Sequence, residues 1–97
     1  MEPTDIYNNL AKVYREFLMD ETMDLSAEFN MESQTKEAAT KLMDKVYSEM
    51  LSTDAFATGQ ATGQATGQVI FTEIDFNENR DALIEMFAEM IIEMMEY

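Results

Sequence analysis

The chain has 97 residues, 20 of them acidic and 6 basic, which gives a formal net charge of −14 at pH 7. This length supports one domain over residues 1–97 and excludes a second. Because the chain contains neither cysteine nor histidine, thiolate nucleophiles, disulfides and zinc sites built from sulfur or imidazole are excluded. The charge also predicts that nucleic acid and anionic lipid are repelled, so any charged partner should be basic.

No segment approaches the roughly 18 consecutive apolar residues of a membrane span. The N-terminal residues also lack the basic region and apolar run of a signal peptide. We therefore expect neither export nor membrane insertion. A cytoplasmic location is expected, with which the absence of cysteine is compatible.

The first half of the chain predicts two helices with a strand between them. Residues 4–23 carry apolar side chains at helical spacing, whereas apolar and polar residues alternate over residues 25–32, the period of a half-buried strand. A second helix is expected from Ser33, which can cap it, to about Leu51. The apolar stripes of these helices are Ile6, Leu10, Val13, Tyr14, Phe17 and Leu18, then Ala39, Leu42, Met43, Val46, Tyr47 and Met50.

Residues 57–68 repeat the tetrapeptide Ala-Thr-Gly-Gln three times and contain all three glycines of the chain. A segment of this composition predicts a flexible linker. The perfect repeat is more typical of slippage or of an engineered linker than of a functional site, because it holds no charged or aromatic side chain.

After the repeat, residues 69–76 are rich in branched and aromatic residues, which favours a second strand. Asn77 or Asn79 can then cap a final helix that runs to Tyr97. The predicted order is helix, strand, helix, linker, strand, helix. This order favours an α+β fold in which two short strands pair and helices cover them. The alternative is a three-helix bundle without a sheet.

The final helix carries a regular row of acidic residues. Their spacings of three and four place them within an arc of roughly 120° and along roughly 27 Å. Like charges at this spacing destabilise a helix, and no basic residue follows Arg80 to relieve them. The row consists of Glu78, Asp81, Glu85, Glu89, Glu93 and Glu96. The opposite arc holds Leu83, Ile84, Phe87, Met90, Ile91, Met94 and Met95.

Two interpretations of this row remain open. A strongly apolar helix needs a solvated outer face, although lysine would serve that purpose as well as glutamate. Alternatively, carboxylates spaced about 6 Å apart along the helix imitate the phosphates of a nucleic-acid strand. In that case a groove lined by Lys and Arg on a partner protein would accept the row.

In size, charge and lack of catalytic groups, the whole chain resembles the small acidic phage-encoded inhibitors that mimic nucleic acid, including anti-CRISPR proteins. The resemblance includes no sequence motif. It implies an inhibitor that blocks a DNA- or RNA-binding enzyme without binding nucleic acid itself.

Other functions fit the sequence less well. Carboxylates are abundant, but no nucleophile motif or glycine-rich phosphate loop accompanies them, so neither an enzyme nor a cofactor is expected. A calcium loop is also rejected, because Arg80 and Met86 stand where its glycine and its bidentate glutamate are needed. A second hypothesis is an antitoxin-like or structural partner, or a homodimer, that binds through an apolar surface at Met94, Met95 and Tyr97.

Overall fold

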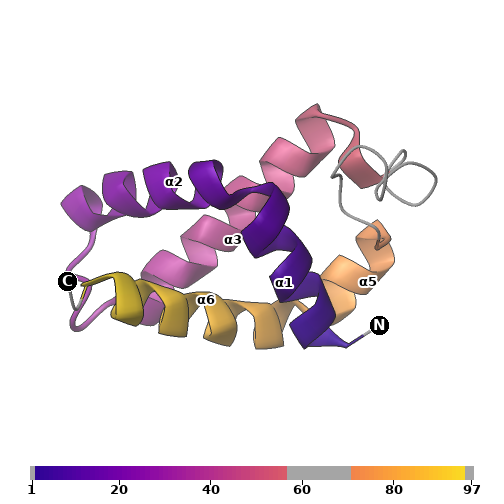
Figure 1. Ribbon diagram of the computed structural model, residues 1–97. Coiled ribbons are helices and arrows are strands. Elements are labelled where there is room, and N and C mark those ends of the chain that lie inside the picture. Colours follow the sequence, from indigo (N-terminus) through magenta and orange to yellow (C-terminus); the bar gives the residue numbers. More distant parts are fainter. Residues whose placement is uncertain (1, 57–70, 96–97) are drawn as a thin grey trace.

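A computed structural model describes residues 2–56 and 71–95, and 84% of these described residues are helical with no strand among them. The predicted α+β fold is therefore wrong, and the domain is all-helical. Figure 1 shows the arrangement of the described helices. They are α1 (Pro3–Val13), α2 (Arg15–Glu28), α3 (Thr35–Ser52), α5 (Glu73–Glu78) and α6 (Arg80–Met95).

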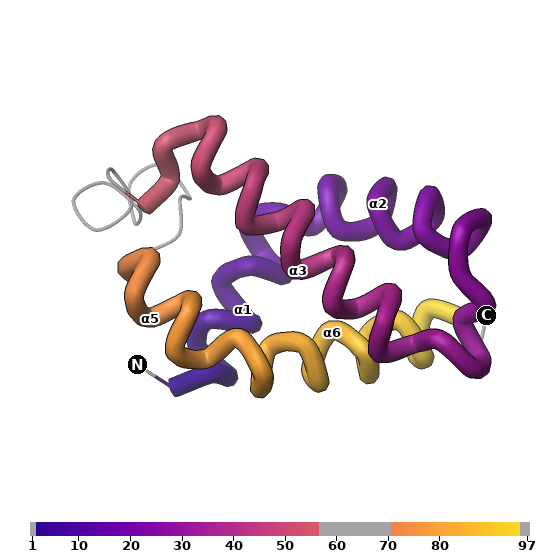
Figure 2. The backbone as a smooth tube through the Cα atoms, turned by 180° about the vertical axis from the view of Figure 1, so that it is seen from behind, coloured from indigo at the N-terminus to yellow at the C-terminus, as the bar shows by residue number. Residues whose placement is uncertain are grey.

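Helix α3 lies at the centre of the fold and packs against both α2 and α6. In the two opposite views, α2 and α6 run in the same direction along the two long sides, and α3 crosses between them (Figures 1 and 2). Two sides of α3 are therefore buried. Its buried residues are Ala38, Ala39, Leu42, Met43, Val46 and Met50.

The predicted first helix is divided in two at Tyr14, which has φ −107° and ψ 27°. The Tyr14 ring packs edge-on against Phe17 with ring centroids 6.3 Å apart, and its hydroxyl forms a hydrogen bond with Thr53, just after α3. An unbroken helix of this length would project past its neighbours. The bend instead lets α1 pack on α6 while α2 packs on α3.

The predicted strand at residues 25–32 is wrong. Its first part completes α2, where Leu25 is buried one helical turn after Thr22. A turn with its own hydrogen bonds then leads to α3: the Asn30 amide donates to Gln34 Oε1 over 2.9 Å, and the Glu32 amide donates to Asn30 Oδ1 over 3.0 Å. The alternation came from a helix end followed by a turn that buries Met31.

The predicted second strand is also wrong, because residues 73–78 form α5. Thr72 caps this helix: the Asp75 amide donates to the Thr72 hydroxyl over 3.0 Å, and the Thr72 amide donates to Asp75 Oδ2 over 3.1 Å. These bonds satisfy amides that a helix end leaves without partners. Residues 57–70, which include the predicted linker and the first two residues of this strand, lie outside the described residues.

The carboxylate in this capping box also has a shifted pKa. Hydrogen bonds from the Thr72 backbone and, to a lesser degree, its side chain lower the pKa of Asp75. A lowered folded-state pKa means that the stabilisation is complete above the unfolded-state pKa. It is lost as the pH falls through the lowered value.

An aromatic cluster joins α5 to the end of α3. Phe71 and Phe76 stack with their ring centroids 6.2 Å apart, and Phe76 also stacks on Tyr47 of α3 at 5.6 Å. Phe56 contacts Phe71 edge-on at 6.2 Å. The two described parts of the chain are therefore joined at the ends that border residues 57–70.

We expect the Thr72→Ala substitution to destabilise the fold by about 0.5 to 2 kcal/mol, because it removes the side chain that caps α5. Chemical denaturation followed by circular dichroism measures this loss. Thr40→Ala is the matched control, since Thr40 lies exposed within α3 and its hydroxyl bonds only to the Lys36 carbonyl. Equal stability changes in the two variants would contradict the assigned cap.

Candidate acidic interface

Packing of α6 fixes the direction in which its carboxylates point. Leu83, Ile84, Phe87 and Ile91 are buried, and this side of the helix packs against α3. With 100° between successive residues, the acidic residues then fall on the opposite side. All four acidic residues of α6 are exposed, namely Asp81, Glu85, Glu89 and Glu93.

Two members of the predicted row are not among the described residues of α6. Glu78 is the exposed last residue of α5, and Asn79 separates it from α6. The Asn79 side-chain amide donates to the Asp75 carbonyl over 2.8 Å, so it closes α5. Glu96 lies outside the described residues. Within the described residues, the continuous row extends from Asp81 to Glu93, roughly 18 Å along the helix.

The described ion pairs join basic residues to acids of α2 and α3. Lys41 pairs with Glu28 of α2 at 2.5 Å, and Lys45 pairs with Glu21 of α2 at 3.2 Å. Arg80 pairs with Asp44 of α3. Within residues 2–56 and 71–95, these ion pairs include none of the four carboxylates on α6. The row is thus not neutralised by the described cations.

The outer face of α6 is less uniform than its sequence predicts. Ile92 is 48% exposed and lies within the carboxylate arc. Met95 is 54% exposed, although it was expected on the buried arc, whereas Met90 and Met94 are half-buried. Apolar side chains therefore interrupt and border the acidic face. The exposed face of α6 therefore combines charged and apolar surface.

Tyr7 of α1 reports on the charge near this face. Its ring contacts Phe87 edge-on, with ring centroids 5.4 Å apart. Burial raises the pKa of the Tyr7 hydroxyl, and the negative charges of Glu93 and Glu89 raise this pKa further. The charges of Glu89 and Glu93 therefore reach the side of α6 that packs against α1.

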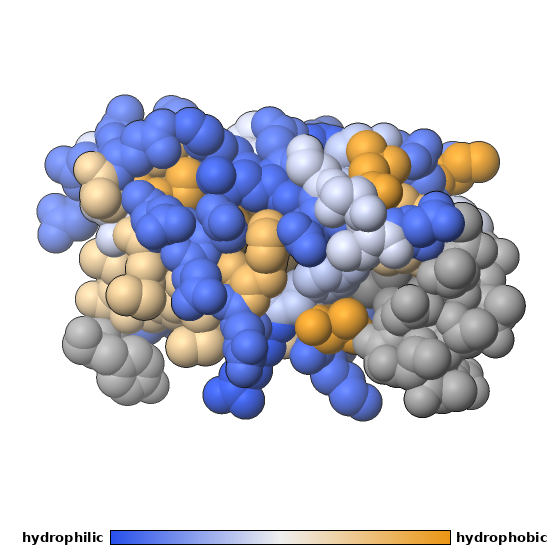
Figure 3. Space-filling model, turned by 90° about the horizontal axis from the view of Figure 1, so that it is seen from above, coloured by the Kyte–Doolittle hydropathy of each residue, from blue (hydrophilic) through white to orange (hydrophobic). Residues whose placement is uncertain are grey.

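A second carboxylate row lies on α2 and was missed in the sequence. Glu16, Asp20 and Asp24 are spaced by four residues and are all exposed. They have no ion pair with a described cation. The spacing itself was a usable signal, but the first helix was predicted to end at Met23. The view onto the α2 side shows a largely hydrophilic surface, with pale-orange areas at the end where α2 and α6 finish (Figure 3).

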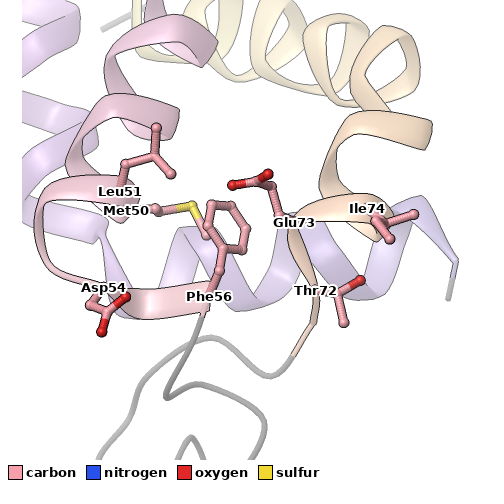
Figure 4. Close-up of a pocket in the computed structure, with 7 residues that line it drawn as sticks. All are labelled: Met50, Leu51, Asp54, Phe56, Thr72, Glu73 and Ile74. Atoms are coloured by element: carbon pink, nitrogen blue, oxygen red, sulfur yellow. The ribbon is translucent and has the colours of Figure 1, made fainter.

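A pocket of about 470 Å³ lies at the other end of the molecule, between α3 and α5. Met50 and Phe56 form its apolar side, and Thr72, Glu73 and Ile74 lie opposite them (Figure 4). The pocket borders residues that the structure does not describe. It therefore does not define a site by itself.

Neither a metal site nor a membrane-spanning helix is found in the described part of the chain. No three acidic side chains there come close enough together to hold a metal ion. No described helix combines the length and the apolar character that a membrane crossing needs. The exposed surface of α2 and α6, which carries both carboxylate rows, is the candidate site.

No family model, curated protein or solved structure matches the chain.

We expect the double substitution Glu89→Gln and Glu93→Gln to lower the pKa of Tyr7 toward its ordinary value without reaching it, because burial is the larger cause of the shift. A pH titration of tyrosine ring signals by NMR, assigned with Tyr7→Phe, measures this change. Glu85→Gln is the control and should have a smaller effect. An unchanged Tyr7 pKa in the double variant would show that the two charges are already compensated.

Proposed function

We propose that the chain is a non-catalytic inhibitor whose acidic face occupies the basic groove of a nucleic-acid-binding protein, such as a CRISPR effector or another defence nuclease. The exposed carboxylates of α6 take the place of phosphates in that groove. The chain itself does not bind nucleic acid, which its net charge of −14 would repel.

The observation that carries this proposal is the carboxylate row of α6, which forms no ion pair with a cation in the described part of the chain. The first two-thirds of the fold pairs charges across helices, as Lys45 does with Glu21. The row instead places like charges one turn apart, each pair of which costs about 0.2 to 0.5 kcal/mol. Glu93 also lies in the last turn of α6, where the described helix has no basic residue to complement its dipole. A cationic partner would remove both costs.

Charge reversal tests this proposal directly. We expect Glu85→Lys, Glu89→Lys and Glu93→Lys together to abolish binding to the basic protein that the unaltered chain captures at low salt, because cations would then face cations. Binding is measured by surface plasmon resonance, and inhibition by the nuclease activity of that protein.

The matched control for this triple variant reverses three exposed carboxylates outside the row, Glu32, Glu37 and Glu73. It has the same net charge as the triple variant, so it separates the position of the charges from their sum. Inhibition that survives reversal of the row, or that is lost equally in the control, would contradict the proposed mechanism.

A second candidate is an antitoxin-like or structural partner that binds mainly through apolar surface. Exposed Met95 and half-buried Met94 support it. The other residue expected in that surface, Tyr97, lies outside the described residues. Such binding would depend little on salt, because few charges would be neutralised.

The salt dependence of affinity separates these two candidates. For the phosphate mimic we expect the logarithm of the association constant to fall steeply and linearly with the logarithm of salt concentration. Binding would release the counterions held by the charged surfaces, and a higher salt concentration opposes that release. Isothermal titration calorimetry at several salt concentrations measures the slope. The variant with Gln at positions 85, 89 and 93 should show a shallower slope, whereas a flat slope for the unaltered chain would favour the apolar interface.

A further inference from the structure

A groove runs between α2 and the C-terminal half of α6, beside α1. Its volume is about 310 Å³, near the lower end of the range for pockets that hold ligands. Figure 1 shows that α1 leads from the side of α6 to the start of α2, and residues of these three helices line the groove. The groove is lined by Tyr7, Ala11, Arg15, Leu18, Met19, Met90 and Met94.

Methionines give this groove an adaptable apolar wall on both sides. Met19 of α2 is 46% exposed, and Met90 and Met94 of α6 are half-buried. Met23, one turn after Met19 on α2, is 68% exposed and continues the apolar strip. Unbranched thioether side chains repack readily around different apolar anchors. The groove is therefore suited to a few large apolar side chains from a partner.

Both rims of the groove are acidic. On α2, the exposed Asp20 and Asp24 lie next to Met23 around the helix, on its solvent side. On α6, Glu93 and Glu89 lie next to Met90, and both act on Tyr7 in the groove wall. A partner segment that inserts apolar side chains into the groove would have carboxylates on both of its sides.

We propose that this groove binds a basic amphipathic helix of a partner protein, with apolar anchors between the methionines and Lys or Arg side chains along the two rims. Such a helix has one apolar stripe flanked by cations, which matches the groove in shape and in charge. The inference goes beyond the proposed function, because it needs no nucleic-acid mimicry and adds α2 to the interface.

Charge also argues against other occupants. A second copy of this chain would bring more carboxylates to the acidic rims, and nucleic acid or anionic lipid would be repelled by them. Arg15 is the one cation among the residues that line the groove. Because a helix C-terminus carries partial negative charge, the partner helix docks with its C-terminal end toward Arg15.

The test uses the full chain and a synthetic helical peptide with leucines at positions i, i+4 and i+7 and lysines on both flanks of that stripe. A scrambled peptide of the same composition is the matched control for its charge. Binding is followed by NMR of methyl-labelled methionines. We expect the signals of Met19, Met90 and Met94 to shift with the amphipathic peptide, while those of the buried Met43 and Met50 do not.

Substitutions then test the groove by affinity. Met19→Gln and Met94→Gln together should weaken peptide binding about tenfold or more, since polar side chains would face the apolar anchors. Leu51→Gln is the control, because Leu51 is 50% exposed near the end of α3 and does not line the groove. Arg15→Gln should weaken binding of a peptide whose C-terminal carboxylate is free, because Arg15 attracts the negative end of the docked helix. Circular dichroism confirms that each variant remains folded.

Equal affinity for the scrambled peptide, or equal loss in Leu51→Gln and in the groove variant, would overturn the proposal. So would methyl shifts confined to methionines outside the groove. These outcomes are independent of the nuclease assay. A further combination of results is that the peptide binds in the groove although reversal of the α6 row leaves inhibition intact. That combination would support the groove and reject the proposed function.

Discussion

The burial of α6 against α3 is the constraint on which the rest of the surface depends. Leu83, Phe87 and Ile91 are fully buried, and burial of such side chains is worth about 1.5 to 3 kcal/mol each. This packing fixes the rotation of α6, because no other side of the helix is apolar enough to replace the buried one. The carboxylates on the far side must then face solvent, whatever they cost each other. Core packing explains why these positions are exposed. It does not explain why they hold acidic residues instead of lysine.

Charge is distributed unevenly over the described surface. Lysines of α3 pair with acids on one flank of α2, such as Lys41 with Glu28, and Arg80 at the start of α6 pairs with Asp44 of α3. The outer faces of α2 and α6 carry carboxylate rows that none of these cations reaches, and the methionine groove lies between the two helices. A basic partner could therefore be recognised by charge at long range and by apolar contact at short range. These two contributions have different salt dependence, so they can be measured separately.

Helical periodicity located the helical stripes. The two predicted strands were wrong because a turn and a helix cap produced strand-like patterns in the sequence. The stripe from Ile6 to Leu18 and that from Ala39 to Met50 were placed correctly, but nothing in the sequence marks the bend at Tyr14, which depends on contacts with Phe17 and Thr53. Alternation over residues 25–32 reflected a helix end and a turn. Thr72 and Asp75 carried a capping signal that the β-branched residues around them obscured. The exposure of the α6 row followed from the sequence, whereas the groove required the positions of α1, α2 and α6 in space.

We infer that the negative charge on α6 exceeds what the fold itself favours. The most direct test is the free energy of unfolding of the variant Glu85→Gln, Glu89→Gln and Glu93→Gln, measured at low and high salt; glutamine has nearly the helix propensity of glutamate. We expect this variant to be more stable than the unaltered chain at low salt, by about 0.5 to 1.5 kcal/mol from the three like-charge pairs it removes. The difference should shrink as salt screens the charges. A variant that is less stable at low salt would show that the carboxylates support the fold, and would contradict the account.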